Sequence, residues 1–242
     1  MAFYEEFNKY YDYIFPTGKP QLQFISKRAL GSKVLDIACG TGNYSIPLAE
    51  QGLDVSAVDL DEGMIRALRQ KAEAKGVTIK AATGDMKLLK EYFQEGGFQT
   101  IFCIGNSLVH LTSIDEIQQV LQDIYSLLEE EGILVLQIVN YDRILKYNVD
   151  HLPTIDNEDV GVSLVRKYDY NPVEHLVYFN TELIFQEQQM KFQNSVSLYP
   201  LKSEELQQML KKAGFKIEEQ YGSFKEDCYN EEAYANIIVA RK

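Results

Sequence analysis

The chain has 242 residues, of which 45% are apolar, and its 36 acidic and 24 basic residues give a formal net charge of −12 at pH 7. This length and apolar content suffice for one domain with a substantial core and exclude an intrinsically disordered chain. Because phosphate binding requires a positive surface and no cluster of Lys or Arg stands out, the charge argues against a nucleic-acid partner. Small molecules are the favoured partners.

The N-terminal stretch MAFYEEFNKYYDYIF is acidic and aromatic and lacks the basic start and apolar core of a signal peptide. No apolar run approaches the length of a membrane-spanning helix, so we expect a cytoplasmic protein without a membrane partner. The three cysteines Cys39, Cys103 and Cys228 are widely spaced and odd in number. This pattern argues against a disulfide framework or a metal site and favours buried, reduced thiols.

The first predicted strand leads directly into a glycine-rich turn. Residues 34–37 form a short, mostly apolar run, which is typical of a strand buried on both faces of a parallel sheet. Gly40 and Gly42 allow positive φ angles and the close approach of a ligand to bare backbone. A helix over 43–50 would then direct its free N-terminal amides towards that ligand.

Two acids at strand ends indicate what the ligand is. Asp36 lies at the end of the first strand, and a second apolar strand ends at Asp59, roughly 20 residues beyond the glycines, where an acid meets ribose hydroxyls in dinucleotide folds. Asp36 would repel a pyrophosphate but suits an ammonium group. S-Adenosylmethionine has an ammonium, a ribose and no phosphate, so it fits better than NAD. The turn alone proves little, because glycine often serves turn geometry only.

Strands and amphipathic helices alternate as far as about residue 140, which is the pattern of an α/β fold with a parallel sheet. The expected elements after Asp59 are a helix carrying Met64, Ile65, Leu68 and Ala72, a strand over 77–82, a strand over 98–104, a helix over 114–128 ended by Gly132, and a strand over 133–139. Five parallel strands are thereby predicted.

Between about 142 and 200 the pattern changes to antiparallel β-structure. The expected strands cover 163–170, 175–186 and 190–199. Their apolar residues alternate with polar ones, which indicates one buried face. A helix with Ser203 at its N-cap and Gly214 at its end follows, and strands near 215–221 and 235–240 complete the first sheet.

The predicted fold is thus a Rossmann-like, seven-stranded and mostly parallel sheet with helices on both faces. Residues 1–141 and 200–242 would form the cofactor-binding domain, with a helical lid over about 1–30, and 142–199 would form an inserted antiparallel β cap.

Four stretches resemble class I S-adenosylmethionine-dependent methyltransferases. VLDIACGTG at 34–42 resembles their first motif, and three others resemble, in the same order, stretches of the glycine N-methyltransferase group: CIGNSLVHL at 103–111, NYDRIL at 140–145 and YGSFK at 221–225. The resemblance covers 33–242. It implies a last strand that runs antiparallel, a cofactor lying across the carboxyl ends of the first four strands, and methyl transfer by in-line displacement to a small acceptor such as an amine nitrogen, leaving S-adenosylhomocysteine.

The resemblance also implies roles for individual residues. Asp36, Ala38 and Gly40 would hold the methionine tail, and Asp59 the ribose. Asp85 and Met86 would contact the adenine, while Asn106 and His110 would line the floor near the methyl group. The remaining expected cofactor contacts are Gly42, Leu60, Met64, Ile104 and Gly105. Asn106, His110 and Tyr141 are the expected catalytic residues, acting by orienting the acceptor.

One departure from the pattern concerns the acceptor. In the glycine group an arginine that clamps the substrate carboxylate stands immediately before the Asn-Tyr-Asp motif, whereas this chain has Val139. Unless Arg143, Arg166 or Lys225 substitutes for it, the missing bidentate anchor disfavours glycine and favours a neutral or cationic amine or a less polar acceptor.

Simpler interpretations of these residues stay open. Asn106 could cap the turn after its strand, and His110 could be a core residue. Tyr141 and Tyr199 could line the acceptor pocket or only pack. The N-terminal tyrosines Tyr4, Tyr10, Tyr11 and Tyr13 could form a lid or an ordinary packed helix. His151 and His175 are interpreted as structural or surface residues, and Cys39 as a small residue in a crowded turn.

Two other functions remain as alternatives: an S-adenosylmethionine-binding regulator without catalysis, and an NAD-dependent oxidoreductase on the same sheet. The sequence leaves open whether the acceptor atom is nitrogen, oxygen or sulfur, and whether the protein is a monomer or a homodimer.

Overall fold

The computed structural model describes residues 2–186 and 190–242, with side chains from residue 6 onward. Its larger sheet consists of β1 (Lys33–Ile37), β2 (Asp54–Asp59), β3 (Lys80–Thr83), β4 (Phe98–Cys103), β5 (Leu128–Val139), β10 (Lys216–Tyr221) and β11 (Ala235–Arg241). The strand order is β10-β11-β5-β4-β1-β2-β3. Strands β1 to β5 are parallel, and β11 runs antiparallel to both of its neighbours. The predicted seven-stranded, mostly parallel sheet is confirmed.

Helices cover both faces of this sheet. One face carries α2 (Lys19–Arg28), α3 (Ser45–Glu50) and α4 (Glu62–Lys75), and the other carries α5 (Leu89–Tyr92), α6 (Ile114–Leu127) and α8 (Ser203–Ala213). Alternate residues of each central strand enter opposite cores, because side chains alternate across a strand: Val34 packs with α2 and α3, and Leu35 with α6. Burial of both faces explains the nearly continuous apolar runs of these strands.

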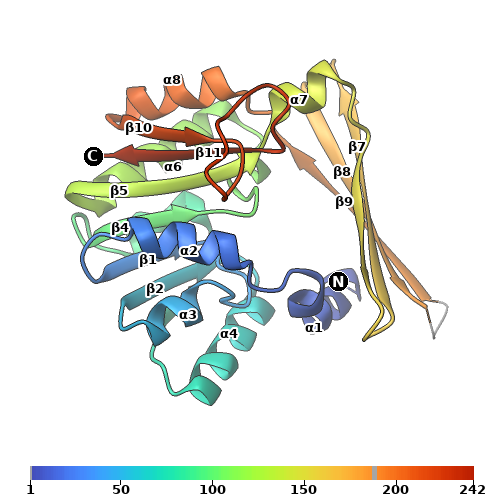
Figure 1. The fold of residues 1–242 in the computed structure, drawn as a ribbon, viewed down its shortest axis with the longest axis horizontal. Coiled ribbons are helices and arrows are strands. Elements are labelled where there is room, and N and C mark those ends of the chain that lie inside the picture. Colours follow the sequence, from blue (N-terminus) through green and yellow to red (C-terminus); the bar gives the residue numbers. More distant parts are fainter. Residues whose placement is uncertain (1, 187–189) are drawn as a thin grey trace.

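A second, antiparallel sheet stands across the carboxyl ends of the parallel strands (Figure 1). It consists of β6 (His151–Asn157), β7 (Val162–Asn171), β8 (Leu176–Phe185) and β9 (Met190–Leu198), in that order. We call it the cap sheet. Helix α7 (Tyr141–Lys146) leads into it from β5, and helix α1 (Ala2–Ile14) lies against its other end. The space between the two sheets is therefore bounded by α1 and α7.

The two faces of the cap sheet differ. Leu164, Leu183 and Phe185 pack with α1, while Tyr168 and Val177 pack with Tyr141 of α7. These residues share the inner face, which is turned towards the seven-stranded sheet. The residues between them in sequence therefore form the outer face.

Several element boundaries differ from the sequence-based expectation. Strand β3 begins at Lys80 and not at Val77, because Gly76 ends α4 in the left-handed conformation and the Val77 N–H bonds back to Ala72. Helix α6 ends at Leu127, and Gly132 lies inside β5, because Leu128 already pairs with Phe98 of β4.

The cap region adds two corrections. Ser203 is the first residue of α8 and not its N-cap; the Asp142 Oδ2 atom of α7 accepts the Ser203 N–H at 2.8 Å. Strand β6 was not predicted, because it is a mostly exposed edge strand that contains Pro153 and few apolar residues. In the described part of the chain, no helix combines the length and the apolar character needed to cross a membrane.

Candidate functional site

The glycine-rich turn after β1 brings the two predicted acids close together. Asp36 is only 2% exposed and accepts a hydrogen bond from the Ser45 hydroxyl at 2.6 Å. Asp59 accepts the Gly40 N–H through Oδ2 at 2.8 Å. Burial raises the pKa of Asp36 to about 8, the bond from Ser45 opposes this, and the nearby Asp59 charge raises it further. Burial also raises the pKa of Asp59.

These carboxylates lack a basic partner within 2–186 and 190–242, since neither forms an ion pair there. A buried carboxylate without a cation is costly to ionise. A ligand that places a positive charge next to Asp36 would therefore stabilise its ionised form. The ammonium group of an amino-acid tail has this chemistry.

The turn leaves little room for a side chain at either of its two glycines. Ala38, Gly40 and Gly42 have φ angles of 60°, 54° and 79°. A Cβ atom on Gly42 would lie 2.7 Å from Leu68 Cγ, and one on Gly40 would lie 3.1 Å from the Tyr11 hydroxyl oxygen. The non-glycine residue Ala38 in the left-handed region is a strained position of the kind that clusters at ligand sites.

Helix α1 covers this turn. The Tyr11 ring packs over Gly40, and burial together with the Asp59 and Asp36 charges raises the pKa of its phenol. The neighbouring Asp12 accepts a hydrogen bond from the Thr41 hydroxyl at 2.5 Å and pairs with Lys71 of α4 at 2.7 Å. Tyr11 thus lies against the turn and near both acids.

The same helix also contacts the cap sheet. The Tyr10 and Phe185 rings meet edge to face with centroids 4.9 Å apart, and the Asn157 side chain donates to the Tyr13 carbonyl at 3.0 Å. These contacts support the lid interpretation for α1, whereas α2 packs on the large sheet through Phe24 and Ile25. The Tyr4 side chain lies outside the described residues.

The residues expected to contact the adenine adjoin Asp59. The Gly84 N–H donates to the Asp59 carbonyl at 2.8 Å, which places Asp85 and Met86 directly beyond Asp59. Asp85 caps the short helix η1 (Met86–Leu88) by accepting the Lys87 N–H. Leu60 is 72% exposed although it is apolar, while Met64 is buried and donates its N–H to Asp61.

The end of β4, next to β1, leads into two of the expected cofactor contacts, Ile104 and Gly105, and then into the expected catalytic residue Asn106. Ile104 is buried, and the Gly105 N–H donates to the Gln137 side chain at 2.7 Å. Asn106 has a φ of 69°. Its amide nitrogen donates to the Tyr141 hydroxyl at 3.1 Å, and its oxygen accepts the Val139 N–H at 2.9 Å.

Asn106 therefore joins the ends of β4 and β5 to α7, rather than capping its own turn. Tyr141 is fully buried, and burial raises the pKa of its phenol. The structure thus brings Asn106 and Tyr141 together, as predicted, in a fixed polar pair.

His110 ends the short helix η2 (Leu108–His110) beyond β4. Its side chain is exposed, and desolvation by the surrounding protein lowers its pKa, which favours the neutral imidazole. The cap reaches this point because the Tyr199 N–H donates to the Val109 carbonyl at 2.8 Å. The Tyr199 hydroxyl itself donates to Glu205 of α8.

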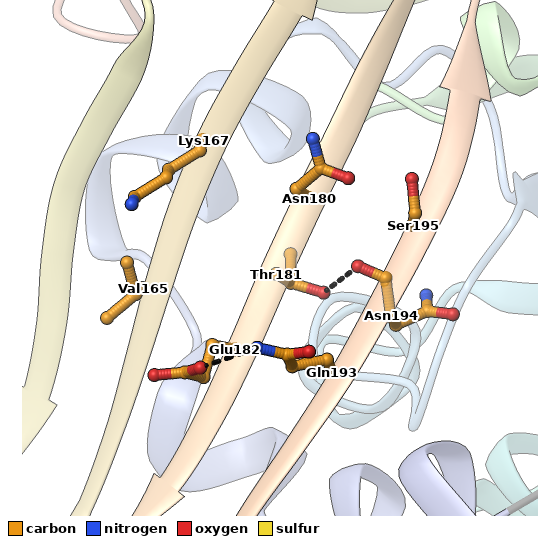
Figure 2. A pocket seen from close by; sticks show the side chains of 8 residues that line it. All are labelled: Val165, Lys167, Asn180, Thr181, Glu182, Gln193, Asn194 and Ser195. Carbon is orange, nitrogen blue, oxygen red and sulfur yellow. Dashed lines mark hydrogen bonds between the residues drawn. The ribbon is translucent and has the colours of Figure 1, made fainter.

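A hollow on the cap sheet lies away from these residues. Figure 2 shows the residues that line it: Val165, Lys167, Asn180, Thr181, Glu182, Gln193, Asn194 and Ser195. Lys167 and Glu182 alternate along their strands with inner-face residues, so the hollow opens on the outer face. Glu182 is occupied there by Lys191 and Gln193. The candidate site is instead at the inner face.

The cysteines and the two other histidines are considered next. Cys39 and Cys103 are buried free thiols, whereas Cys228 is exposed, contrary to the expectation of burial, because it lies in the loop before β11. His151 is exposed beside Asp150, and His175 is exposed beside Tyr170. Within the described ranges, no group of three or more His, Cys, Asp or Glu residues could hold a metal ion.

Sequence reasoning missed the contacts of Asp12 and Lys71 with the glycine turn. The only local signal was an acid next to Tyr11 in an aromatic helix, and that signal does not say where the helix docks.

Known proteins resemble this chain in sequence and in fold. A family described as "Methyltransferase domain" matches residues 34–132. The chain is 31% identical over 211 residues to a glycine/sarcosine N-methyltransferase of Aphanothece halophytica, covering 87% of this chain and 76% of that protein. The fold resembles the CcbJ methyltransferase from Streptomyces caelestis, with a TM-score of 0.81, 23% identity, and 93% and 89% of the two chains covered. It also resembles an S-adenosylmethionine-dependent methyltransferase from Clostridium acetobutylicum, with a TM-score of 0.83, 18% identity and 98% of each chain covered.

Proposed function

Because the chain belongs to the class I S-adenosylmethionine-dependent methyltransferases, close to the glycine N-methyltransferase group, we propose that it methylates the amine nitrogen of a small molecule. The relative from Aphanothece halophytica is named as a glycine/sarcosine N-methyltransferase, which supports an amine acceptor. Family membership also removes the oxidoreductase alternative. We keep a cytoplasmic location and a monomeric or homodimeric state as proposals.

The single observation that carries the cofactor assignment is the pair of acids beside the glycine turn, Asp36 buried and Asp59 half-buried. Asp36 offers a charge to the ammonium of the methionine tail, and Asp59 offers acceptors to the ribose hydroxyls. The bare backbone of Gly40 donates to Asp59 and lies under Tyr11. Two carboxylates beside a crowded stretch of backbone fit S-adenosylmethionine, because they attract its ammonium group. They do not fit a pyrophosphate, because they would repel its negative charge.

When bound, S-adenosylmethionine supplies an electrophilic methyl group on a sulfonium, which a nucleophile takes by in-line displacement. The protein's part is alignment: an acceptor held about 3 to 3.5 Å from the methyl carbon reacts faster because its approach is already fixed. Asn106 is suited to this part, since Tyr141 and Val139 hold its amide in one orientation and leave one N–H of its amide nitrogen for the acceptor.

His110 and the lid complete this proposal. An amine acts as nucleophile only when it is unprotonated, and a neutral His110 can accept a hydrogen bond from its N–H. Tyr11 and Asp12 fasten α1 over the turn, so that water is kept from the reacting groups.

The test is methyl transfer from methyl-labelled S-adenosylmethionine to a panel of small acceptors: glycine, sarcosine, ethanolamine, methylamine, a phenol and a thiol. We expect labelled N-methyl product together with an equal amount of S-adenosylhomocysteine. Cofactor binding is measured in parallel by calorimetry.

Transfer to the phenol or thiol alone would contradict an amine acceptor. Tight cofactor binding without any product would favour the regulatory alternative. Loss of transfer in the Asn106→Asp variant, with unchanged cofactor binding, would support the proposed role of Asn106.

A further inference from the structure

Strands β4 and β5 separate at their carboxyl ends. Their last paired residues are Cys103 and Leu136, although β5 continues to Val139. Beyond Cys103, Gly105 and Asn106 have φ angles of 85° and 69°. Glycine and asparagine are the residue types that adopt this left-handed conformation most readily, and the chain leaves the strand direction here. The backbone N–H groups beyond the last pair therefore need partners from outside the strand ladder.

Two side-chain amides supply these partners. The Gln137 oxygen accepts the Gly105 N–H at 2.7 Å, and the Asn106 oxygen accepts the Val139 N–H at 2.9 Å. The two bonds run in opposite directions between the same two strand ends. Because a backbone N–H can bond only to the oxygen of an amide, each side chain keeps its nitrogen for another partner.

The Gln137 nitrogen is the unused donor of this arrangement. Asn106 Nδ2 donates one of its hydrogens to the Tyr141 hydroxyl at 3.1 Å. Gln137 Nε2 forms no hydrogen bond with any residue of 2–186 and 190–242. The Gln137 side chain is half-buried, and Gly105 beside it is exposed, so a small ligand can reach the amide. An amide nitrogen bonds as a donor only, and it therefore selects a ligand atom with a lone pair, such as oxygen.

Gln137 is fixed to the segment that carries the candidate site. It alternates along β5 with Leu136 and Ile138, which are buried in the core under α6. Gln137 therefore shares the opposite face of β5 with Val139. Its partner Gly105 is an expected cofactor contact, and the next residue is Asn106, the expected acceptor-orienting residue. The Gln137 amide is thus bonded to the segment that joins the cofactor side to the acceptor side.

The donors at these strand ends are neutral. Within the part of the chain that the structure describes, none of the three cations considered from the sequence, Arg143, Arg166 and Lys225, bonds to either amide. The two acids of the glycine turn lack a basic partner as well. A carboxylate on the acceptor would add a negative charge beside neutral donors, whereas a hydroxyl or ether oxygen adds none. The arrangement therefore favours an uncharged oxygen.

We infer that Gln137 is a specificity-determining residue that donates its amide N–H groups to an uncharged oxygen on the acceptor. The substrate class is then an amine that carries a hydroxyl, ether or carbonyl oxygen. This inference rests on the proposed amine methylation. It narrows the expectation of an acceptor other than glycine to one chemical class.

The experiment compares four amines that differ in their oxygen: ethanolamine, 2-methoxyethylamine, propylamine and glycine. Protein saturated with S-adenosylhomocysteine is titrated calorimetrically with each amine, and the KM and kcat of methyl transfer are determined separately. Gln137→Glu keeps an oxygen for the Gly105 N–H and replaces the donor nitrogen by an acceptor. The matched control is Gln99→Glu at the start of β4, where the side-chain oxygen likewise accepts a backbone N–H, from Ser32 at 2.7 Å.

We expect the unmodified protein to bind ethanolamine and 2-methoxyethylamine at least tenfold more tightly than propylamine, and glycine less tightly than ethanolamine. Gln137→Glu should raise the ratio of ethanolamine affinity to 2-methoxyethylamine affinity at least tenfold. The reason is that an ether oxygen can only accept a hydrogen bond, whereas a hydroxyl can donate one to the new carboxylate. The KM values should change in the same ratio with little change in kcat. A general loss of structure would weaken both amines alike, and Gln99→Glu should change the ratio less than twofold.

Four results would overturn the inference: equal affinity for propylamine and the oxygen-bearing amines, binding of none of them, tighter binding of glycine than of ethanolamine, or an unchanged ratio in Gln137→Glu. Failure of the proposed function is distinguishable, because it would appear as a Gln137-dependent preference in binding without methylation of any amine.

Discussion

The glycine turn after β1 and the inner face of the cap sheet are two walls of the same candidate site. Local sequence spacing specifies the turn, whereas the register of the paired strands specifies the cap face. The turn gathers Asp36, Gly40, Gly42 and Asp59 from two adjacent parallel strands and the loop between them. The inner face of the cap takes its residues from three antiparallel strands, for example Tyr168, Phe179 and Val196 in register. A one-residue slip of β7 would move Tyr168 to the outer face, because side chains alternate along a strand. The glycine turn, which we call the cofactor wall, is therefore specified locally. The inner face of the cap sheet, which we call the acceptor wall, depends on strand register.

The sharpest test of the local wall is Gly42→Ala. Its Cβ would lie 2.7 Å from Leu68 Cγ at a φ of 79°, whereas a Cβ on Gly52, at a φ of 89°, would meet no atom within 4 Å. We expect Gly42→Ala to lower the free energy of unfolding by about 3 kcal/mol and the Gly52→Ala control by about 1 kcal/mol, from backbone strain alone. Urea denaturation measures both. Equal losses would show that the turn is not tightly packed.

The second test removes the charge from the local wall and keeps its shape. Asp36→Asn retains an acceptor for Ser45 but loses the carboxylate that we assign to the cofactor ammonium. We expect S-adenosylmethionine affinity to fall roughly a hundredfold, or about 2.7 kcal/mol. The control is Asp54→Asn at the exposed start of β2, where the carboxylate pairs with Lys80. Calorimetry that finds the same affinity in both variants would contradict the assignment.

The same variant has a pH signature. The folded pKa of Asp36, about 8, lies above the ordinary value of 3.8, so the folded state binds the proton more tightly. Its contribution to stability is complete below about pH 4 and is lost as the pH rises towards 8. Thermal unfolding of ligand-free protein between pH 5 and 8 should therefore show a smaller loss of stability for Asp36→Asn than for the unmodified protein. If the variant and the unmodified protein lose the same stability between pH 5 and 8, the pKa of Asp36 in the folded protein lies near its ordinary value of 3.8.

The smallest expected effect concerns the junction of the two walls. Asn106→Asp keeps the acceptor for the Val139 N–H and loses the donor to Tyr141. We expect kcat to fall at least tenfold with unchanged cofactor affinity. Tyr141→Phe should lower kcat about threefold, and the double variant should match Asn106→Asp alone, because the two side chains act as one pair. Steady-state kinetics on the amine acceptor measures this. A loss confined to cofactor affinity would move Asn106 to the cofactor wall.

The sequence by itself predicted the five parallel strands, the two strand-end acids and the change to antiparallel structure near 142. These features rest on short-range spacing: apolar periods of a few residues, and an acid at a strand end. The spacing between the glycines and Asp59 works in the same way, since one βαβ unit fixes it. Asn106 and Tyr141 were also named from sequence, although their hydrogen bond was not.

Tertiary structure alone decided how distant segments meet. The docking of Tyr11 on Gly40, the capping of α8 by Asp142 and the edge strand β6 all join residues that no local pattern connects. The packing of Tyr168 with Tyr141 is of the same kind, since strand register determines which residues of β7 lie on the inner face. Local periodicity sets which face of an element is apolar, and only the packing of all elements determines what that face meets.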